Sequence, residues 1–317
     1  MGSQRAAVAG LALLALIWGY NWVPLKLGIP CIGALPFAAL RAFLGAAVLF
    51  CLVWLTGRPL RLPPGSLTSL ALLGLLQTTG FLGLTMWALV SGGAGRTAIL
   101  SNTMPFWLLL LAWPLLGERP RGSEWVPVVL GLAGLILIIA PWHLHGVTSS
   151  LLALGGAISW AGSSVVAKTL HRRKNVDVLS LTAWQMLLGA APLVVAGAVL
   201  VPDSVQWSGT LVWTLAYAVV MATALGWLLW LLVLEKLPAG VAGIGNLGTP
   251  VVGVLASWLQ LGERPTLSEA VGMVLVLSAL GTLLLGGMTS KSSASKSRLT
   301  GKADVGQVGS VEKVVRP

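Results

Sequence analysis

Residues 94–124 read AGRTAILSNTMPFWLLLLAWPLLGERPRGSE, and residues 239–269 read AGVAGIGNLGTPVVGVLASWLQLGERPTLSE. At a constant offset of 145 residues, the two stretches share an initial Ala-Gly, a helix proline and a Leu-Gly-Glu-Arg-Pro end. Leucine-rich helices match one another by chance, but a Gly-Glu-Arg-Pro end at a fixed distance from a proline does not. The period is far too long for a solenoid repeat. The pattern therefore predicts one half-protein unit that is duplicated.

The composition is that of a membrane protein. Of the 317 residues, 56% are hydrophobic and 9% are charged, and the mean hydropathy is +0.89. A soluble domain carries about 25% charged residues. Apolar runs of about 20 residues, long enough to cross a bilayer, follow one another from residue 7 to residue 287. We therefore predict an all-α polytopic membrane protein.

We predict ten transmembrane helices. They cover residues 7–28, 36–56, 67–90, 96–116, 125–141, 149–170, 178–201, 209–234, 240–260 and 268–287. The first unit is 7–141, the second is 149–287, and the basic tail 289–317 has the composition of a disordered segment. The net charge of +11 is spread over short loops and this tail, so it does not indicate a nucleic-acid partner.

The distribution of Lys and Arg predicts the orientation. Cytoplasmic loops carry an excess of these residues. If Arg5 is inside, the inside loops hold most of the loop cations, whereas the opposite loops contain only Arg264. Both termini are then cytoplasmic. Because each unit has an odd number of spans, the two units have opposite topology, a common plan for secondary transporters with a site near the midplane.

The chain resembles a known family at several of these motifs. They are Leu16-Ile17-Trp18-Gly19-Tyr20-Asn21-Trp22, the prolines Pro105 and Pro250, and the two Leu-Gly-Glu-Arg-Pro ends. Over residues 7–287 the chain resembles the EamA-type exporters of the drug/metabolite transporter superfamily. The resemblance implies ten helices in two inverted five-helix repeats around a central cavity, and export of small metabolites. The best-understood bacterial member type exports aromatic amino acids, so amino acids are the first candidate cargo; phosphorylated or nucleotide-linked metabolites and drugs are the alternatives.

Prolines within spans predict helix kinks. Pro24, Pro105 and Pro250 each remove the hydrogen bond to the carbonyl four residues earlier, and Gly248 adds a point where the ninth span can bend. Freed carbonyls are costly against lipid but suit a polar cavity. The predicted substrate-binding lining consists of aromatic, amide and hydroxyl side chains at similar depth: Trp18, Asn21, Gln77, Asn102, Trp160, Ser163, Trp227 and Asn246.

Arg41 is the candidate headgroup ligand, since it lies about five residues inside the second predicted span. A guanidinium there can pair with a substrate carboxylate through two hydrogen bonds. A phosphate-bearing cargo would require several converging cations, and few are available.

The charged residues also bear on energy coupling. Every Asp and Glu lies at a predicted span end, in a loop or in the tail, whereas intramembrane proton relays rest on ionisable residues inside spans. We therefore predict a facilitative uniporter, with exchange or proton coupling as the alternative.

An enzyme is the non-transport alternative. The sequence has no His-Glu-x-x-His metal helix and no Gly-x-Ser-x-Gly nucleophile turn. We therefore expect no enzyme, no metal and no cofactor. The expected partners are a small-molecule substrate and membrane lipids, and we expect a monomer.

Overall fold

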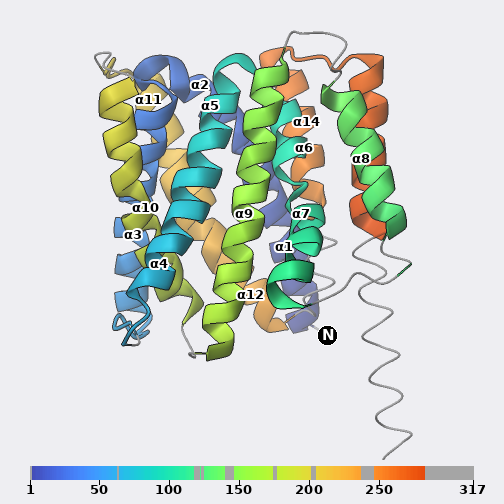
Figure 1. Cartoon of the computed structure of the whole chain (residues 1–317). Coiled ribbons are helices and arrows are strands. Elements are labelled where there is room, and N and C mark those ends of the chain that lie inside the picture. The colour runs from blue at the N-terminus through green and yellow to red at the C-terminus, as the bar shows by residue number, and fades with distance from the viewer. Residues whose placement is uncertain are drawn as a thin grey trace, which may run out of the picture.

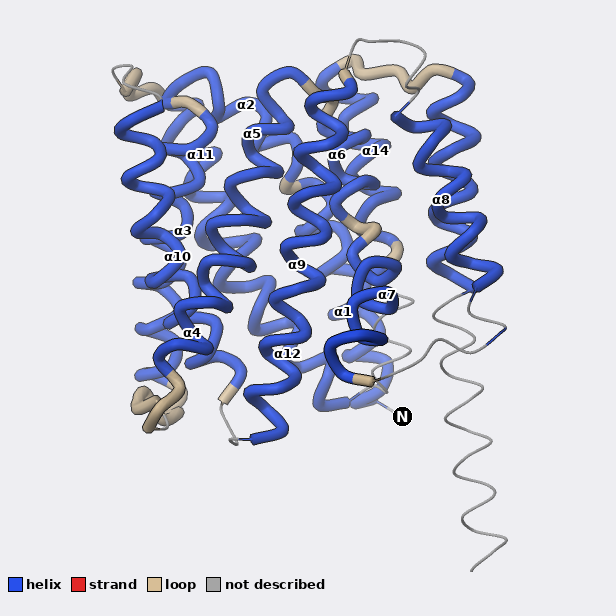
Figure 2. The backbone as a smooth tube through the Cα atoms, in the orientation of Figure 1, coloured by secondary structure: helices blue, strands red, loops and turns tan. Residues whose placement is uncertain are grey.

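The computed structural model describes residues 2–62, 64–117, 122, 125–139, 146–173, 177–200, 205–236 and 246–282. Within these ranges the regular elements are all helical, and most run side by side along one common direction (Figures 1 and 2). The predicted basic tail 289–317 lies outside the described residues.

The helices of the first unit are α1 (Gly2–Tyr20), α2 (Trp22–Ile32), α3 (Ala34–Leu55), α4 (Leu67–Gly74), the π-helix η1 (Leu75–Leu82), α5 (Gly83–Ser91), α6 (Ala94–Ser101), α7 (Met104–Leu116) and α8 (Trp125–Ile139). Those of the second are α9 (Val147–Arg173), α10 (Val178–Leu200), α11 (Gly209–Ala216), the π-helix η3 (Tyr217–Leu225), α12 (Gly226–Lys236) and α14 (Gly248–Leu261). A further helix covers Leu267–Thr282.

In the part of the chain that the structure describes, seven helical stretches are long and apolar enough to cross a membrane, and three shorter apolar helices accompany them. All ten overlap the predicted spans. The boundaries differ most at the first span, where α1 begins at Gly2 and α2 ends at Ile32 instead of at residues 7 and 28. Helix α9 continues to Arg173, and residues 240–245 of the ninth predicted span lie outside the described residues. The structure is thus that of a polytopic helical membrane protein.

The helices of the two units pack against one another in a reciprocal way. The second spans meet as α3 against α10, and the fourth and ninth meet as α6 against α14. The first span, α1, packs on α12 and α14 of the second unit, while its counterpart α9 packs on η1, α5 and α7 of the first. Each unit therefore buries its first helix in the other.

Glycines allow these helices to approach closely, as small residues do in membrane helix pairs. A methyl group on Gly189 of α10 would lie 2.3 Å from the carbonyl oxygen of Gly74. A methyl on Gly272 would lie 2.6 Å from the carbonyl oxygen of Gly134 in α8. Larger residues at these positions would push the helix pairs apart.

The duplicated Leu-Gly-Glu-Arg-Pro motif begins with the same turn in both copies. Gly117 ends α7 with φ 71° and ψ 12°, and Gly262 ends α14 with φ 68° and ψ 13°. This left-handed conformation is favourable for glycine and terminates many helices. In the second copy this turn ends α14, and Glu263 is the next residue of the chain.

Candidate functional site

Each of the three predicted helix prolines lies in the first turn of a helix that follows an interruption. Asn21 separates α1 from α2, which contains Pro24; Asn102 and Thr103 separate α6 from α7, which contains Pro105. Leu247 precedes α14, whose first residues are Gly248, Thr249 and Pro250. A proline is tolerated in the first turn because its missing N–H has no partner there in any case.

The interruption at Asn102 is the sharpest of the three. Its ψ is 3° and that of Thr103 is −2°, far from the helical value of about −42°. The fourth span is therefore two helices joined by a turn rather than the single kinked helix that the sequence suggested. The Asn102 side chain donates to the carbonyl oxygen of Ala98 at 2.8 Å, which leaves its amide oxygen for another donor.

Two π-helical segments, η1 and η3, occupy equivalent places in the third and eighth spans. Such segments are rare and appear often at functional sites. Side chains from other helices donate to carbonyls in or beside both: Ser159 to Leu76 at 2.8 Å, and Trp18 to Ala222 at 2.9 Å. Each π segment is thus held by the first helix of the opposite unit.

The structure brings Trp18 and Trp227 together. Their ring centroids are 6.4 Å apart in an edge-to-face arrangement, and Trp230 joins them at 5.9 Å from Trp18. This aromatic cluster lies between α1 and α12. A neighbouring pair, Tyr20 and Tyr217, has centroids 5.3 Å apart.

A second group unites Gln77, Trp160 and Ser163. The Ser163 hydroxyl contacts the side-chain oxygen of Gln77 and donates to the carbonyl of Trp160 at 2.7 Å. The Trp160 ring lies 4.8 Å from that of Phe81. This group joins η1 to α9, as the first joins α1 to η3 and α12.

The asparagines differ in their hydrogen bonding. The Asn246 side-chain oxygen accepts from the Thr249 hydroxyl at 3.0 Å. The Asn21 side-chain oxygen is buried without a partner in the described part of the chain, as is the Ser101 hydroxyl beside Asn102. Burying such polar atoms is energetically unfavourable unless a hydrogen-bond partner is supplied.

Arg41 forms no hydrogen bond or ion pair with any described residue, and its Nε atom is fully buried. One turn before it, the Phe37 ring packs against Gly28 of α2; one turn after it, Gly45 packs against Met186 and Thr223. Residues four apart share a helix face, so Arg41 leaves α3 towards the interior of the bundle and not towards lipid.

By contrast, Lys26 and Arg96 are engaged. Lys26 donates to the carbonyls of Leu89 and Gly92 at the end of α5. Arg96 donates to those of Ile138 and Ile139 at the end of α8. They stabilise helix ends and are not free for a substrate.

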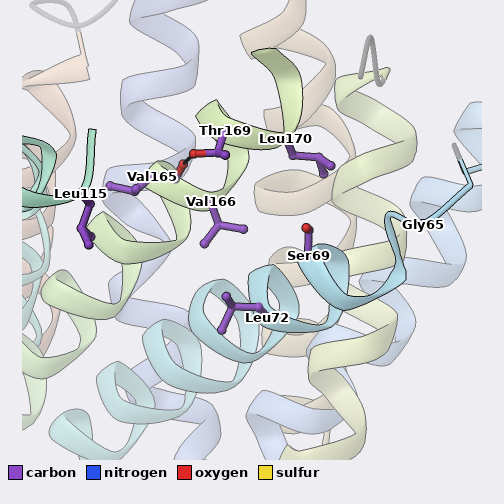
Figure 3. A pocket seen from close by; sticks show the side chains of 8 residues that line it. All are labelled: Gly65, Ser69, Leu72, Leu115, Val165, Val166, Thr169 and Leu170. Carbon is purple, nitrogen blue, oxygen red and sulfur yellow. Dashed lines mark hydrogen bonds between the residues drawn. The ribbon is translucent and has the colours of Figure 1, made fainter. Parts of the chain in front are cut away.

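A cavity of about 420 Å³ opens between α4, α7 and α9 (Figure 3). It is lined by Gly65, Ser69, Leu72, Leu115, Val165, Val166, Thr169 and Leu170, and the predicted site residues are not among these. The Thr169 hydroxyl already donates to Val165. This cavity therefore offers mainly apolar surface and does not suit a charged headgroup.

Helix α14 connects the interrupted spans. A methyl group on Gly253 would lie 2.9 Å from Cβ of Ala98 and 3.2 Å from Cδ1 of Trp22; one on Gly248 would lie 3.2 Å from Cβ of Ala15. The helix thus packs against α1, α2 and α6, the helices that precede or follow the interruptions of the first and fourth spans.

Sequence reasoning missed the π segments and Tyr217, whose hydroxyl donates to the carbonyl of Ile17 at 2.9 Å. A polar run, Gln77-Thr78-Thr79-Gly80, marks η1 in the sequence. The sequence of η3, Tyr-Ala-Val-Val-Met-Ala-Thr-Ala-Leu, carries no comparable signal.

The helices form two units that pack against each other, and several spans are interrupted or contain a π-helical segment. These features are those of a multi-pass membrane protein of the transporter class. The chain belongs to the EamA-like transporter family, whose sequence model matches residues 5–140 and again residues 147–285.

Curated relatives carry transporter names. The chain is 30% identical over 273 residues to the uncharacterized transporter YoaV of Bacillus subtilis, covering 84% of this chain and 92% of that protein. It is 27% identical to a probable amino-acid metabolite efflux pump of Escherichia coli (88% and 94% covered) and 26% identical to a riboflavin transporter of Rhizobium johnstonii (88% and 89% covered). A solved crystal structure has a TM-score of 0.62 at 18% identity, covering 89% of this chain and 98% of that one, which supports the fold.

Proposed function

We propose that this transporter exports small metabolites, in the first place amino acids with aromatic side chains, by alternating access. The observation that carries the proposal is Arg41. Its guanidinium points into the bundle with its Nε buried and unpaired among the described residues, and an unpaired buried charge is strongly unfavourable. A substrate carboxylate would complete it through charge-assisted hydrogen bonds.

Aromatic side chains at the two π segments support the class of cargo. Trp18 with Trp227, and Trp160 with Phe81, offer flat surfaces there. The amides of Asn21, Gln77, Asn102 and Asn246, and the Ser163 hydroxyl, would serve the amino group and carboxylate. A relative named as an amino-acid metabolite efflux pump favours the same cargo.

Ten spans in two inverted five-helix repeats, residues 7–141 and 149–287, are part of the proposal. The two family matches, the two π segments and the reciprocal packing of α1 and α9 all support it. The interruptions next to Pro24, Pro105, Gly248 and Pro250 would act as hinges while the halves rock. Both termini would be cytoplasmic, the membrane would be the bacterial inner membrane, and the transporter would act as a monomer.

Facilitative transport is supported by the described carboxylates. Glu263 accepts from backbone N–H groups, Glu269 pairs with Arg96, and Asp177 pairs with Arg58. All three lie at helix ends and are engaged with protein partners. A proton relay would require a carboxylate that alternates between partners at the midplane.

Uptake into liposomes that contain the purified protein tests this function. Labelled tryptophan, phenylalanine, riboflavin and a sugar phosphate are compared with empty liposomes, without a pH gradient or voltage. We expect saturable uptake of the aromatic amino acids. Uptake of the sugar phosphate alone would contradict the proposed class of cargo. Uptake that appears only with a proton gradient would contradict the proposed uniport mechanism.

The variant Arg41→Gln tests whether Arg41 binds the carboxylate of the substrate. Loss of a charge-assisted hydrogen bond should raise the half-saturating tryptophan concentration about 10- to 100-fold. Riboflavin, which has no carboxylate, would not be affected in this way. The control is Arg264→Gln, because Arg264 is an exposed arginine at the end of a helix. Unchanged tryptophan transport in Arg41→Gln would remove Arg41 from the site.

A further inference from the structure

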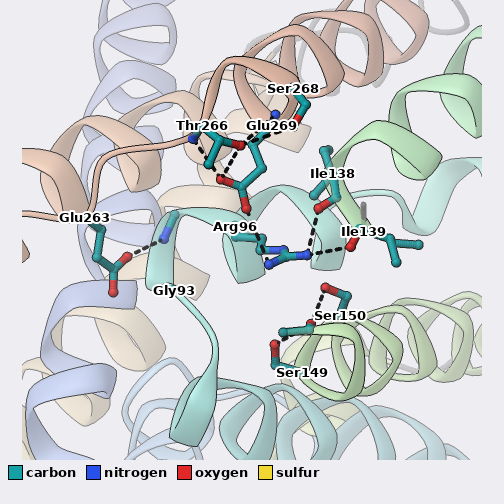
Figure 4. Close-up of polar contacts among 12 residues, drawn as sticks. Gly93, Arg96, Ile138, Ile139, Ser149, Ser150, Glu263, Thr266, Ser268 and Glu269 are labelled. Carbon is teal, nitrogen blue, oxygen red and sulfur yellow. Dashed lines mark hydrogen bonds and ion pairs between the residues drawn. The ribbon is translucent and has the colours of Figure 1, made fainter. Parts of the chain in front are cut away.

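The first turn of α6 is held by two carboxylates of the second unit (Figure 4). The Glu263 carboxylate accepts from the N–H of Ala94 at 2.6 Å and from the N–H of Gly95 at 3.3 Å. One residue further, Arg96 forms an ion pair with Glu269 at 3.3 Å. Glu263 lies in the short segment that follows α14, and Glu269 lies in the first turn of the helix Leu267–Thr282.

The position of Glu263 uses the helix terminus well. The first N–H groups of a helix have no partner within it, and the positive end of the helix dipole favours an anion. Gly93, with φ −69° and ψ 144°, supplies no side chain to cap α6. A carboxylate from the opposite unit takes the place of the cap.

The second carboxylate fixes the same turn from another side. Arg96 lies between Glu269 and the carbonyls of Ile138 and Ile139 (Figure 4), and its Nη1 lies 2.6 Å from where a methyl group on Gly146 would be. The guanidinium therefore connects α6, α8 and the helix Leu267–Thr282. Its side chain is 16% exposed, as is that of Glu269, so solvent screening of this pair is limited.

The packing of the fourth span differs between its two ends. All but one of the residues of α6 are buried, and α6 packs on α14, α9, α2 and α5. In α7 the buried residues are Phe106 and Ala112, and α9 is its main packing partner among the described helices. Among the described residues, the two units therefore pack more closely at the start of α6 than along α7.

We propose that Glu263 and Glu269 form a gate lock: the two hydrogen bonds that Glu263 accepts and the ion pair of Glu269 link the second unit to the first turn of α6 and hold the transporter closed at this end. The lock joins the Ala-Gly of the first copy of the duplicated stretch, Ala94-Gly95, to the Gly-Glu-Arg-Pro end of the second copy at Glu263. Opening this end requires the Glu263 carboxylate to leave Ala94 and Gly95. The inference rests on alternating access in the proposed function, but not on the identity of the cargo. Glu118, the sequence twin of Glu263, lies outside the described residues, and the proposal uses the described lock alone.

The experiment measures access to the locked interface. Ser257 of α14 is 1% exposed, and its Cβ would lie 3.5 Å from a methyl group on Gly95. In a background with Cys31→Ser and Cys51→Ser, the variant Ser257→Cys is reconstituted in liposomes. Its labelling by a membrane-impermeant maleimide is followed from the side on which α6 begins.

We expect Glu263→Ala to raise the labelling rate about fivefold, the population change that corresponds to losing a helix cap worth about 1 kcal/mol. Glu263→Gln, which keeps an acceptor but loses the charge, should give a smaller increase. Arg264→Gln is the matched control and should not change the rate. Equal labelling in the Glu263 variants and the control would overturn the lock.

A second variant removes the donor instead of the acceptor. Ala94 is the first residue of α6, a position that favours proline, and Gly93 already has the extended conformation required before proline. Ala94→Pro should therefore also speed labelling, and combining it with Glu263→Ala should add little. Full additivity of the two would also overturn the lock. Since labelling needs no cargo, failure of amino-acid uptake would leave this result standing, and the reverse also holds.

Discussion

The indole N–H of Trp18 in α1 donates to the carbonyl oxygen of Ala222 in the π segment η3 at 2.9 Å, across 204 residues of sequence. A π segment leaves backbone carbonyls without their usual partners in the helix, and inside a membrane such groups must be satisfied by other side chains. The contact thus joins the first span of one unit to the eighth span at the point where the helix is irregular.

Trp18→Phe tests this contact. The substitution keeps the aromatic packing against Trp227 and removes the donor, so we expect the free energy of unfolding to fall by about 0.5–1.5 kcal/mol. The measurement is thermal or denaturant unfolding in detergent. Trp54→Phe is the control, because Trp54 is 73% exposed. Equal stability of the two variants would show that the hydrogen bond contributes nothing.

Gly253→Ala tests the crossing of α14 between the two units. The new methyl group would lie 2.9 Å from Cβ of Ala98, which is closer than packed carbon atoms tolerate, so we expect a loss of about 1–3 kcal/mol in stability. Gly10→Ala is the matched control in α1, because its methyl would lie 3.9 Å from Leu229. That change should be neutral or stabilise by up to about 1 kcal/mol. The same unfolding measurement compares the two variants. A Gly253→Ala variant as stable as wild type would contradict the close packing.

Asn21→Leu separates stability from transport. The variant removes a buried oxygen that has no partner among the described residues, so unfolding should become more difficult, by about 1 kcal/mol. If the oxygen serves the cargo, tryptophan uptake falls at the same time. Uptake in liposomes, measured beside Asn102→Leu, provides the comparison. Wild-type uptake in Asn21→Leu would remove Asn21 from the substrate site.

Asp177 predicts a pH dependence at the start of α10. Burial raises the pKa of its carboxyl group, but hydrogen bonds from the Ser180 N–H and the Arg58 guanidinium, together with the Arg58 charge, lower it more, so the pKa lies below its ordinary value of 3.8. A depressed pKa contributes stability that is fully present above 3.8 and is lost as the pH falls through the folded-state pKa. Because Arg58 is 40% exposed, we expect about 0.2–1 kcal/mol.

Thermal unfolding from pH 6 downwards, compared between wild type and Asp177→Asn, checks this dependence. The stability difference between the two proteins should shrink below about pH 4. Arg58→Gln should reproduce part of the effect. A difference that stays constant over the whole range would contradict the assigned protonation.

The sequence by itself determined the helical membrane class, the places of the ten apolar segments and the family. These depend on hydropathy, because runs of about 20 apolar residues cross a bilayer. The sequence predicted kinks at Pro105 and Pro250, whereas the structure places both prolines in the first turn of a helix that follows an interruption. The sequence also identified Arg41 as a cation inside a span, since composition alone shows that a charge there is exceptional.

Only the tertiary structure decided which of those residues meet. Trp18 joins Trp227, and Gln77 joins Ser163, because α1 and α9 each pack in the opposite unit, a relationship between segments that are distant in the chain. The same packing engages Lys26 and Arg96 at helix ends and leaves Arg41 without a described partner. It also brings side chains of neighbouring helices to the carbonyls of the π segments, as Ser159 donates to Leu76 and Trp18 to Ala222.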